Sequence, residues 1–379
     1  MSAKGLAIDG LTLRLGAFSL KSLDLAVAEG ETLVLLGPNG AGKSVTLETI
    51  AGFYRPSAGR ISIGGRDVTG LPPERRNVAL VLQNFGLFPH LSVKGNIALG
   101  LRRSRDAAAR GRLARLLDEF AIRHLADRAP ASLSPGEKQR TALARALAAE
   151  PDLFLFDEPF SALDAETRER LRGELREFLA RAGTPSIFVT HDRADALAFG
   201  GGLAVMHGGR VVQQGNARAV FGAPRDRFVA EFLGVENILA ARLLGRSGAH
   251  VTLLLGEARL HAVAPERLEA GPEVLVAIRA EEVEFAPSGV APHEAANRLA
   301  GHVRGTVEEG VLTRVRLDCG FPLTGLLMSR EARRLNLGPR SVVEVEIPCA
   351  AIRLLPTAAS RGQCAQRAEI VASPGSLRG

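Results

Sequence analysis

The stretch Gly37-Pro38-Asn39-Gly40-Ala41-Gly42-Lys43-Ser44 decides the fold, because it matches the phosphate-binding loop pattern G-x-x-x-x-G-K-[ST] at every fixed position. The apolar run Thr32–Leu36 before it predicts a buried strand, and residues 44–51 after it predict a helix. Glycines let successive backbone N–H groups turn inward around phosphates, and the helix N-terminus adds partial positive charge. The alternative is a glycine-rich turn that contains a lysine by chance. The flanking strand and helix, and the presence of only five lysines in the chain, favour the phosphate site.

A second apolar run ends in two carboxylates and provides the acidic half of the same predicted site. Residues 153–156 are Leu-Phe-Leu-Phe, and Asp157 and Glu158 follow them. We expect this strand end to lie beside the loop, with Lys43 on the β- and γ-phosphates and with Ser44 and Asp157 holding Mg²⁺. Glu158 would polarise an attacking water. Two adjacent acids at a strand end are also common at protein surfaces, so the functional interpretation depends on the loop upstream.

Length and composition limit the class of protein. The 379 residues suggest two or three domains at roughly 150 residues each. With 46% hydrophobic and 23% charged residues, the chain is not disordered, collagen-like or a disulfide scaffold. No apolar run reaches the ~18 residues of a membrane helix, and the first residues contain no signal-peptide pattern. The three cysteines follow no metal-ligand spacing. We therefore expect a soluble, cytoplasmic protein of several domains.

The formal net charge of +7 raises the question of a nucleic-acid partner. Aromatic residues make up only 4% of the chain, with no Trp, so few rings could stack on bases. We therefore interpret the densest basic stretch as a solvated helix face, and we expect no nucleic-acid partner. Its arginines are Arg102, Arg103, Arg105, Arg110, Arg112 and Arg115.

The chain changes in character after residue 234. Residues 1–235 alternate β-branched runs with helical stretches, which predicts an α/β domain with a largely parallel sheet and a helical insert at 100–150. Residues 236–356 contain two similar units that open at Asn237 and Asn297, and these predict a duplicated small β-barrel. A Pro/Gly/Ala connector at 286–295 separates the units. The Ser/Gly/Arg-rich residues 357–379 are predicted to be a disordered tail.

A further motif lies between the loop and the carboxylates, where Leu133-Ser134-Pro135-Gly136-Glu137 opens a predicted helix that runs to residue 148. Ser134 and Glu137 have capping-box spacing, and a helix cap alone would explain both residues. The segment nevertheless resembles the LSGGQ signature of ATP-binding-cassette (ABC) ATPases. Gln83, the run Ser161-Ala162-Leu163-Asp164 and His191 follow the order of the remaining motifs of that family. A lone histidine at a strand end is usually structural, but here it belongs to an ordered set. The resemblance covers residues 6–234.

The resemblance implies a head-to-tail homodimer that encloses two ATP molecules, each held by one phosphate loop and covered by residues 134–137 of the other chain. It implies that Glu158 is the general base, that His191 contacts the γ-phosphate, and that Gln83 joins the Mg²⁺ site and links it to a membrane partner. An aromatic residue upstream of the loop stacks on adenine in this family; Phe18 is the nearest candidate, although it could be strand core. Pro135 departs from the family pattern, because it has no N–H for the γ-phosphate. The implied ATP-binding residues are Phe18, Gly37, Pro38, Asn39, Gly40, Ala41, Gly42, Lys43, Ser44, Val45, Ser134, Gly136 and Glu137.

The rest of the chain favours an importer ATPase over a soluble ABC protein. Residues 84–93 resemble the surface that receives the coupling helix of a permease, although their apolar side chains could equally belong to the core of the helical insert. The two β units resemble TOBE domains, and soluble ABC proteins usually carry two cassettes where this chain has one. The resemblance therefore implies permease subunits in the membrane, a substrate-binding protein acting through them, and a position on the cytoplasmic face of the inner membrane.

Several features are similar to molybdate/tungstate importers: the run at 14–18, Val45 in place of the usual Thr, and the run at 321–327. Sulfate, ferric iron, polyamine and sugar importers have the same architecture and remain alternatives. In molybdate-binding domains of this kind, Ser, Arg and Lys side chains meet the anion. The matching positions here are Glu294, Ala296 and Pro348, so we expect residues 236–356 to bind no oxyanion.

Overall fold

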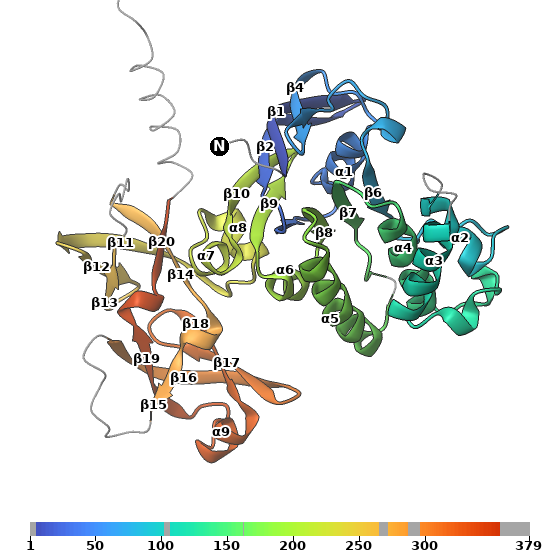
Figure 1. The fold of residues 1–379 in the computed structure, drawn as a ribbon. Helices are drawn as coiled ribbons and strands as arrows, with labels where there is room; N and C mark the ends of the chain where they lie inside the picture. Colours follow the sequence, from blue (N-terminus) through green and yellow to red (C-terminus); the bar gives the residue numbers. More distant parts are fainter. Residues whose placement is uncertain (1–4, 102–106, 162, 265–271, 287–295, 357–379) are drawn as a thin grey trace, which may run out of the picture. The chain divides into compact units, whose positions relative to one another are not determined.

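The computed structural model describes residues 5–101, 107–161, 163–264, 272–286 and 296–356 (Figure 1). The chain divides into two compact units, Met1–Val220 (unit 1) and Phe221–Gly379 (unit 2). The predicted boundary after residue 235 and the TOBE-like character of the second part stay predictions. Residues 287–295 of the connector, the tail at 357–379, and Arg102, Arg103 and Arg105 lie outside the described residues.

The main sheet of unit 1 has six strands in the order β10-β9-β3-β8-β7-β6. Strands β9, β3, β8, β7 and β6 run parallel, and β10 pairs antiparallel with β9. A parallel sheet covered on both faces needs apolar strands, and every residue of β8 is buried. The predicted α/β fold with a largely parallel sheet is therefore confirmed. The strands span Thr32–Leu36 (β3), Val78–Val81 (β6), Leu153–Asp157 (β7), Ser186–Thr190 (β8), Gly202–His207 (β9) and Arg210–Asn216 (β10).

A second sheet in unit 1 is antiparallel, with the order β2-β1-β4-β5, and the sequence did not predict it. Burial alternates along part of β1, as expected of a strand with one covered face. Leu6 and Leu20 of this sheet belong to the same buried cluster as Leu35 of the main sheet. This shared core places the start of β2, with Phe18, close to the main sheet. The strands span Leu6–Leu15 (β1), Phe18–Val27 (β2), Ala58–Ile63 (β4) and Arg66–Asp67 (β5).

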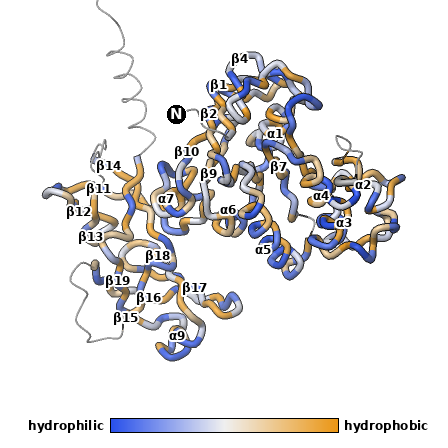
Figure 2. Tube along the Cα trace, viewed as in Figure 1, coloured by the Kyte–Doolittle hydropathy of each residue, from blue (hydrophilic) through white to orange (hydrophobic). Residues whose placement is uncertain are grey.

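Helices connect the parallel strands of unit 1. Hydrophobic and hydrophilic residues alternate along α5 (Figure 2), and it buries Leu171, Leu175, Phe178 and Leu179, which share one helix face. This face covers the sheet, since Phe178 contacts the ring of Phe154 in β7. The helices span Lys43–Ala51 (α1), Ala165–Ala182 (α5), Arg193–Phe199 (α6) and, across the division between the units, Ala217–Gly222 (α7).

The predicted helical insert is present as α2 (Val93–Gly100), α3 (Ala107–Glu119) and α4 (Pro135–Ala148), which share a core of their own. Arg110 and Arg115 of α3 are exposed, which favours the solvated-face interpretation of the basic stretch. Among the residues that the structure describes, no helix is both long and apolar enough to cross a membrane.

Unit 2 contains two five-stranded antiparallel sheets, with the orders β13-β12-β11-β14-β20 and β15-β19-β16-β17-β18. Both sheets contribute to one core, for example through Leu253, Val276, Val315 and Val345. The predicted all-β C-terminal region is confirmed. Its elements span Arg227–Phe232 (α8), Asn237–Ser247 (β11), His250–Leu255 (β12), Ala258–Val263 (β13), Glu273–Ile278 (β14), Glu284–Ala286 (β15), Ala296–Glu309 (β16), Leu312–Asp318 (β17), Pro322–Met328 (β18), Ser329–Arg334 (α9), Val342–Pro348 (β19) and Arg353–Leu355 (β20).

Two repeats open at Asn237 and Asn297, and the side chain of each asparagine hydrogen-bonds to the backbone of the other repeat. The Asn237 amide accepts the N–H of Thr324 at 2.6 Å and donates to its carbonyl at 2.9 Å. The Asn297 amide makes the same pair of bonds to the backbone of His261, at 2.5 Å and 2.8 Å. The last strands are exchanged as well, because β15 joins the second sheet and β20 joins the first. Each repeat therefore contributes to both sheets.

Candidate active site

The phosphate-loop residues 37–44 join the end of β3 to the start of α1. Gly40 and Gly42 have φ angles of 78° and 104°, a left-handed backbone that favours glycine. A Cβ on Gly42 would lie 2.6 Å from Cζ of Phe18, so only glycine lets the phenyl ring lie this close to the loop. The structure thus places the predicted strand, loop and helix in sequence, with Phe18 directly beside the loop.

Lys43, the first residue of α1, is 5% exposed. Its ammonium group donates to the carbonyl groups of Gly37 at 2.8 Å and Pro38 at 3.2 Å, and it lies 3.8 Å from Oε1 of Glu158. Burial lowers the pKa of Lys43, while the charges of Glu158 and Asp157 oppose this lowering. A buried cation held mainly by neutral carbonyl groups can exchange them for phosphate oxygens, which are stronger, charged acceptors.

Ser44 and Asp157 bring two oxygens together at the entrance of the loop. Ser44 Oγ donates to Oδ1 of Asp157 at 3.0 Å. Burial raises the pKa of Asp157, an effect that the Ser44 hydrogen bond opposes. Mg²⁺ prefers hard oxygen ligands and usually takes one or two from the protein, with phosphates and water completing its coordination. The hydroxyl and carboxylate present here fit that ion.

Glu158 follows β7 with a φ of 45°, an uncommon backbone conformation for a residue other than glycine. Its Oε2 lies 3.0 Å from Nδ1 of His191, the residue that follows β8. Because β7 and β8 are neighbours and Asp157 pairs with Val189, the residues just beyond the two strands meet. The two carboxylate oxygens of Glu158 thus face Lys43 on one side and His191 on the other.

A cavity of about 600 Å³ opens over these groups, within the size range of small-molecule sites. It combines an aromatic wall, a buried cation, a hydroxyl, two side-chain amides and two carboxylates, which together suit a ligand with a planar ring and several phosphates. Four further residues of the predicted site lie beside this lining rather than in it, and these are Gly37, Pro38, Ala41 and His191. The lining residues are Phe18, Asn39, Gly40, Gly42, Lys43, Ser44, Val45, Gln83, Asp157 and Glu158.

The signature-like residues Ser134, Gly136 and Glu137 do not line this cavity. Ser134 Oγ accepts the N–H of Glu137 at 3.3 Å, and Glu137 Oε2 accepts the N–H of Ser134 at 2.7 Å, so α4 begins with a complete capping box. The bond from the Ser134 backbone lowers the pKa of Glu137. Pro135 lies in the first turn, where the helix needs no N–H. A contact of these residues with the ATP of a second copy stays a prediction.

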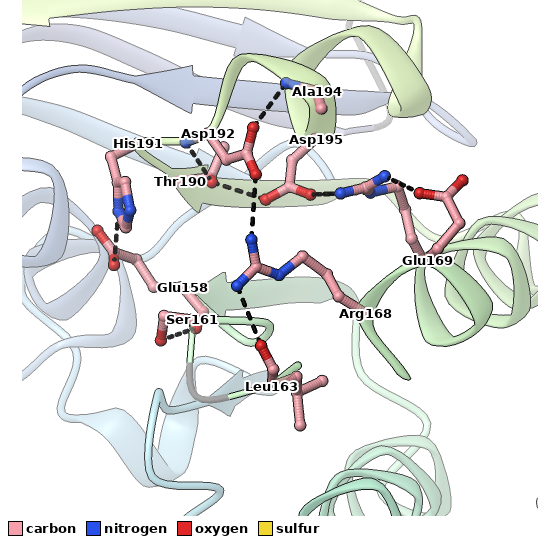
Figure 3. A network of polar contacts seen from close by, with 11 residues as sticks. Glu158, Ser161, Leu163, Arg168, Glu169, Thr190, His191, Asp192, Ala194 and Asp195 are labelled. Carbon is pink, nitrogen blue, oxygen red and sulfur yellow. Dashed lines mark hydrogen bonds and ion pairs between the residues drawn. The ribbon is translucent and has the colours of Figure 1, made fainter. Parts of the chain in front are cut away.

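The sequence did not point to the polar network behind His191, which Figure 3 shows. Thr190 and Asp195 bond to each other, Arg172 bonds to Asp195, and Arg168 bonds to Asp192. One signal was present: two acids follow the strand end at 192 and 195, and two arginines recur four residues apart in the preceding helix. Without the tertiary structure, nothing in the sequence pairs these charges with one another.

The proteins that this chain resembles agree with the geometry of the site. The family model described as ABC transporter matches residues 20–161. The molybdate/tungstate import ATP-binding protein WtpC of Pyrococcus horikoshii is 38% identical over 90% of this chain and 96% of its own length. The sulfate/thiosulfate import ATP-binding protein CysA 2 of Chromobacterium violaceum is 40% identical over 93% and 95%. The spermidine/putrescine import ATP-binding protein PotA of Frankia alni is 42% identical over 75% and 64%.

A solved structure supports the same assignment. The dimeric ATP-binding cassette MJ0796, in a post-hydrolysis state bound to ADP and Pi, has a TM-score of 0.50 and 30% identity, covering 56% of this chain and 99% of its own. WtpC and CysA 2 match at least 90% of this chain, PotA matches 75% of it, and the solved cassette covers 56% of it. The chain therefore belongs to the ABC transporter family, and it is an import-type ATP-binding protein whose ATP hydrolysis is coupled to transport.

Proposed function

We propose that the protein binds ATP in the cavity over the phosphate loop, hydrolyses it there, and drives import of an inorganic oxyanion through a separate permease. One observation carries the catalytic part. Lys43, the Ser44–Asp157 pair and the Glu158–His191 pair form one continuous set of contacts at the carboxyl ends of three parallel strands. Open α/β sheets bind their ligands at this edge.

Binding follows from the charges around the cavity. The loop N–H groups and the N-terminus of α1 would face the phosphates, and Lys43 would neutralise the β- and γ-phosphates. Phe18 is placed to stack on the adenine, because its ring lies against Gly42 of the loop. Ser44 and Asp157 would hold Mg²⁺, and the amide oxygen of Gln83, which lines the same cavity, is the third candidate ligand. Bound Mg²⁺ would neutralise charge on the phosphates.

Hydrolysis requires a base beside the γ-phosphate. Glu158 would accept a proton from the attacking water, as the bond between the γ-phosphorus and the bridging oxygen breaks and leaves ADP and phosphate. His191 would orient the Glu158 carboxylate through the 3.0 Å contact and reach the γ-phosphate with its other ring nitrogen. With 17% of its side chain exposed, Glu158 is shielded from bulk water, which strengthens its electrostatic action.

We propose that the site is completed by a second copy of the chain. Ser134 is exposed at the start of α4 and does not line the cavity, which supports a contact with the nucleotide of another molecule. Its hydroxyl and the helix N-terminus would then face the γ-phosphate of that copy. The solved cassette MJ0796 is a dimer, which supports this arrangement.

A groove of about 440 Å³ beside the helical insert is the proposed contact with the permease. It is lined by Phe88, His90, Leu91, Gly95, Ala98 and Leu99. Phe88 is 44% exposed, which argues against the core interpretation for this residue, whereas Phe85 is 7% exposed and belongs to the core. The proposed occupant of the groove is a short helix of a membrane permease. A substrate-binding protein would act through that permease from the opposite side of the membrane. This contact would hold the protein at the cytoplasmic face of the inner membrane.

For the cargo we propose molybdate or tungstate, which WtpC, at 38% identity over nearly the whole chain, imports by its name. Sulfate, ferric iron, polyamines and sugars are the alternatives, and a soluble role without transport is the last one. Unit 2 is proposed to be TOBE-like and to lack an oxyanion site. Ala296 pairs with Pro348 in register, and neither provides a cation, while Glu294 lies outside the described residues.

The test is the ATPase rate of the protein assembled with its permease and binding protein, with each candidate cargo added in turn. We expect molybdate or tungstate to stimulate hydrolysis, and Lys43→Ala to abolish it. Stimulation by sulfate alone would contradict the molybdate or tungstate assignment and keep an oxyanion importer, and stimulation by ferric iron, a polyamine or a sugar would contradict the oxyanion assignment and keep the importer. If the protein does not assemble with the permease and no cargo changes its rate of ATP hydrolysis, the soluble alternative is favoured.

A further inference from the structure

Thr190, the last residue of β8, and residues 191–195, which follow it and include His191, take part in a network of polar contacts (Figure 3). Thr190 donates through Oγ1 to Oδ2 of Asp195 at 2.8 Å and accepts the backbone N–H of Asp192 at 2.9 Å. Asp195 also accepts from Nε of Arg172 at 2.9 Å. Thr190, Asp195 and Arg172 are all buried, so this part of the network is fixed in the fold.

Arg168, one turn before Arg172 on α5, makes a looser set of contacts. Its Nη1 lies 3.4 Å from Oδ2 of Asp192, and its Nη2 donates to the carbonyl of Leu163 at 3.1 Å. Its Nε is buried and has no partner among the described residues. The ion pair with Asp192 is long for a hydrogen bond, and 31% of each side chain is exposed.

The contacts of Arg168 join the two segments that carry the reacting side chains. Asp192 is the residue after His191, and Leu163 belongs to the loop that starts at Glu158 and is held by the bond from Ser161 Oγ to the Glu158 carbonyl at 2.9 Å. The same two segments meet in front through the 3.0 Å contact of His191 with Glu158. The two segments are thus connected at two points, by the His191–Glu158 contact and by the contacts of Arg168 with Asp192 and Leu163. Together these contacts define how the imidazole faces the carboxylate.

We infer that Arg168 is a positioning residue for ATP hydrolysis, which holds Asp192 to the Leu163 carbonyl and thereby keeps His191 on Glu158. The inference rests on the proposed roles of Glu158 and His191. Arg168 makes no hydrogen bond to either side chain, so its effect passes through Asp192. The planar guanidinium suits this role because it donates to two oxygens at once in a fixed geometry, which a lysine cannot do.

The experiment is a double-mutant cycle in the full-length protein. Arg168→Ala, His191→Ala and the combined variant are compared with the unchanged protein. Arg170→Ala is the matched control, since it removes an arginine that is 62% exposed from the same helix. Release of radiolabelled phosphate gives kcat and KM down to very low rates, and a fluorescent ATP analogue gives the dissociation constant.

We expect Arg168→Ala to lower kcat by about tenfold, less than the hundredfold loss that a ~1 Å misplacement can cause. KM and ATP affinity should stay unchanged, because Lys43 and Ser44 are untouched, and Arg170→Ala should have no effect. In the His191→Ala background, Arg168→Ala should lower kcat by less than about twofold, because the side chain that it positions is gone.

Equal losses in the two backgrounds, or an unchanged kcat for Arg168→Ala, would overturn the inference. Full activity of His191→Ala would instead refute the proposed role of His191, so the two failures are distinguishable. If Arg168→Ala does not fold, as judged by circular dichroism, Arg168→Lys provides the test. It should lower kcat several-fold at unchanged ATP affinity when His191 is present, and an unchanged kcat would again overturn the inference.

Discussion

The phosphate site of unit 1 and the asparagine contacts of unit 2 both depend on polar side chains, but their burial and their hydrogen bonds differ. Asn237, Asn297 and Lys43 are buried, whereas Asp157 and Glu158 are half-buried. In unit 2, the amides of Asn237 and Asn297 each donate to and accept from backbone groups of the opposite repeat. In unit 1, Lys43, Asp157 and Glu158 carry charges and line an open cavity, and their hydrogen bonds go to loop carbonyl groups, to Ser44 and to His191.

This difference distinguishes polar side chains that stabilise the fold from polar side chains that bind a ligand. A neutral buried group with a complete set of backbone partners is satisfied in the folded chain and has no capacity left for a ligand. A charge removed from water is costly unless it is paired, so a buried lysine with two half-buried carboxylates around a cavity indicates a site that a charged ligand can complete. Substitution in unit 2 should therefore change stability alone, and substitution in unit 1 should change chemistry.

The largest expected effect is on turnover. Glu158→Gln should lower kcat by about 10²–10⁴-fold, because it removes the base that accepts the proton of the attacking water. ATP affinity should be kept, since Lys43, Ser44 and Asp157 remain. Glu177→Gln, an exposed position on α5, is the control. Steady-state phosphate release measures both variants, and turnover of Glu158→Gln near the unchanged rate would remove Glu158 from the role of base.

A smaller effect is expected on the stability of unit 2. Asn297→Ala should destabilise it by about 2–6 kcal/mol, because the N–H and carbonyl of His261 lose their partners at a cost of about 1–3 kcal/mol each. Hydrogen exchange followed by mass spectrometry resolves unit 2 from unit 1. Arg304→Ala, which breaks an exposed ion pair with Asp318, should have a much smaller effect on stability. A lower ATPase rate per folded molecule of Asn297→Ala would contradict the claim that substitution in unit 2 changes stability alone.

Loss of the aromatic wall should weaken nucleotide binding by less. Phe18→Ala should cost about 1–3 kcal/mol of ATP affinity, the usual range for stacking of an aromatic ring on a base. Phe53→Ala is the control, because Phe53 is 62% exposed and does not line the cavity. Titration with a fluorescent nucleotide measures both. If Phe18→Ala lowers only the melting temperature and leaves affinity per folded molecule unchanged, Phe18 is strand core and no more.

The smallest effect concerns pH and stability without nucleotide. Burial raises the pKa of Asp157, so the folded protein binds this proton more readily than the unfolded chain, and the ionised carboxylate lowers stability at neutral pH. Asp157→Asn should therefore raise the melting temperature near pH 7. The gain should vanish below the usual pKa of an aspartic acid, about 3.9, where both states are protonated. A lower melting temperature near neutrality would mean that the Ser44 hydrogen bond outweighs the cost of burial.

The parts of the site that the sequence predicted are those set by local spacing. The glycines at 40 and 42, the strand that ends at Asp157 and the cap at Ser134 each follow from neighbours within a few residues. The antiparallel sheet was missed because it depends on pairing between distant segments, such as Ile8 with Ile61. The Arg172–Asp195 pair was missed for the same reason, since charged residues on a helix are usually solvated and only the tertiary fold buries these two.

The central claim, that ATP is bound at this site and enclosed by a second copy of the chain, is tested most directly by the molar mass of Glu158→Gln. The mass is measured by light scattering after size-exclusion chromatography, with Mg²⁺ and with or without ATP. Because binding is kept and hydrolysis is stopped, we predict a monomer without nucleotide and a stable dimer with ATP, which Ser134→Ala in the same chain should weaken. A mass that ATP does not change, in protein shown to bind ATP, would contradict the account.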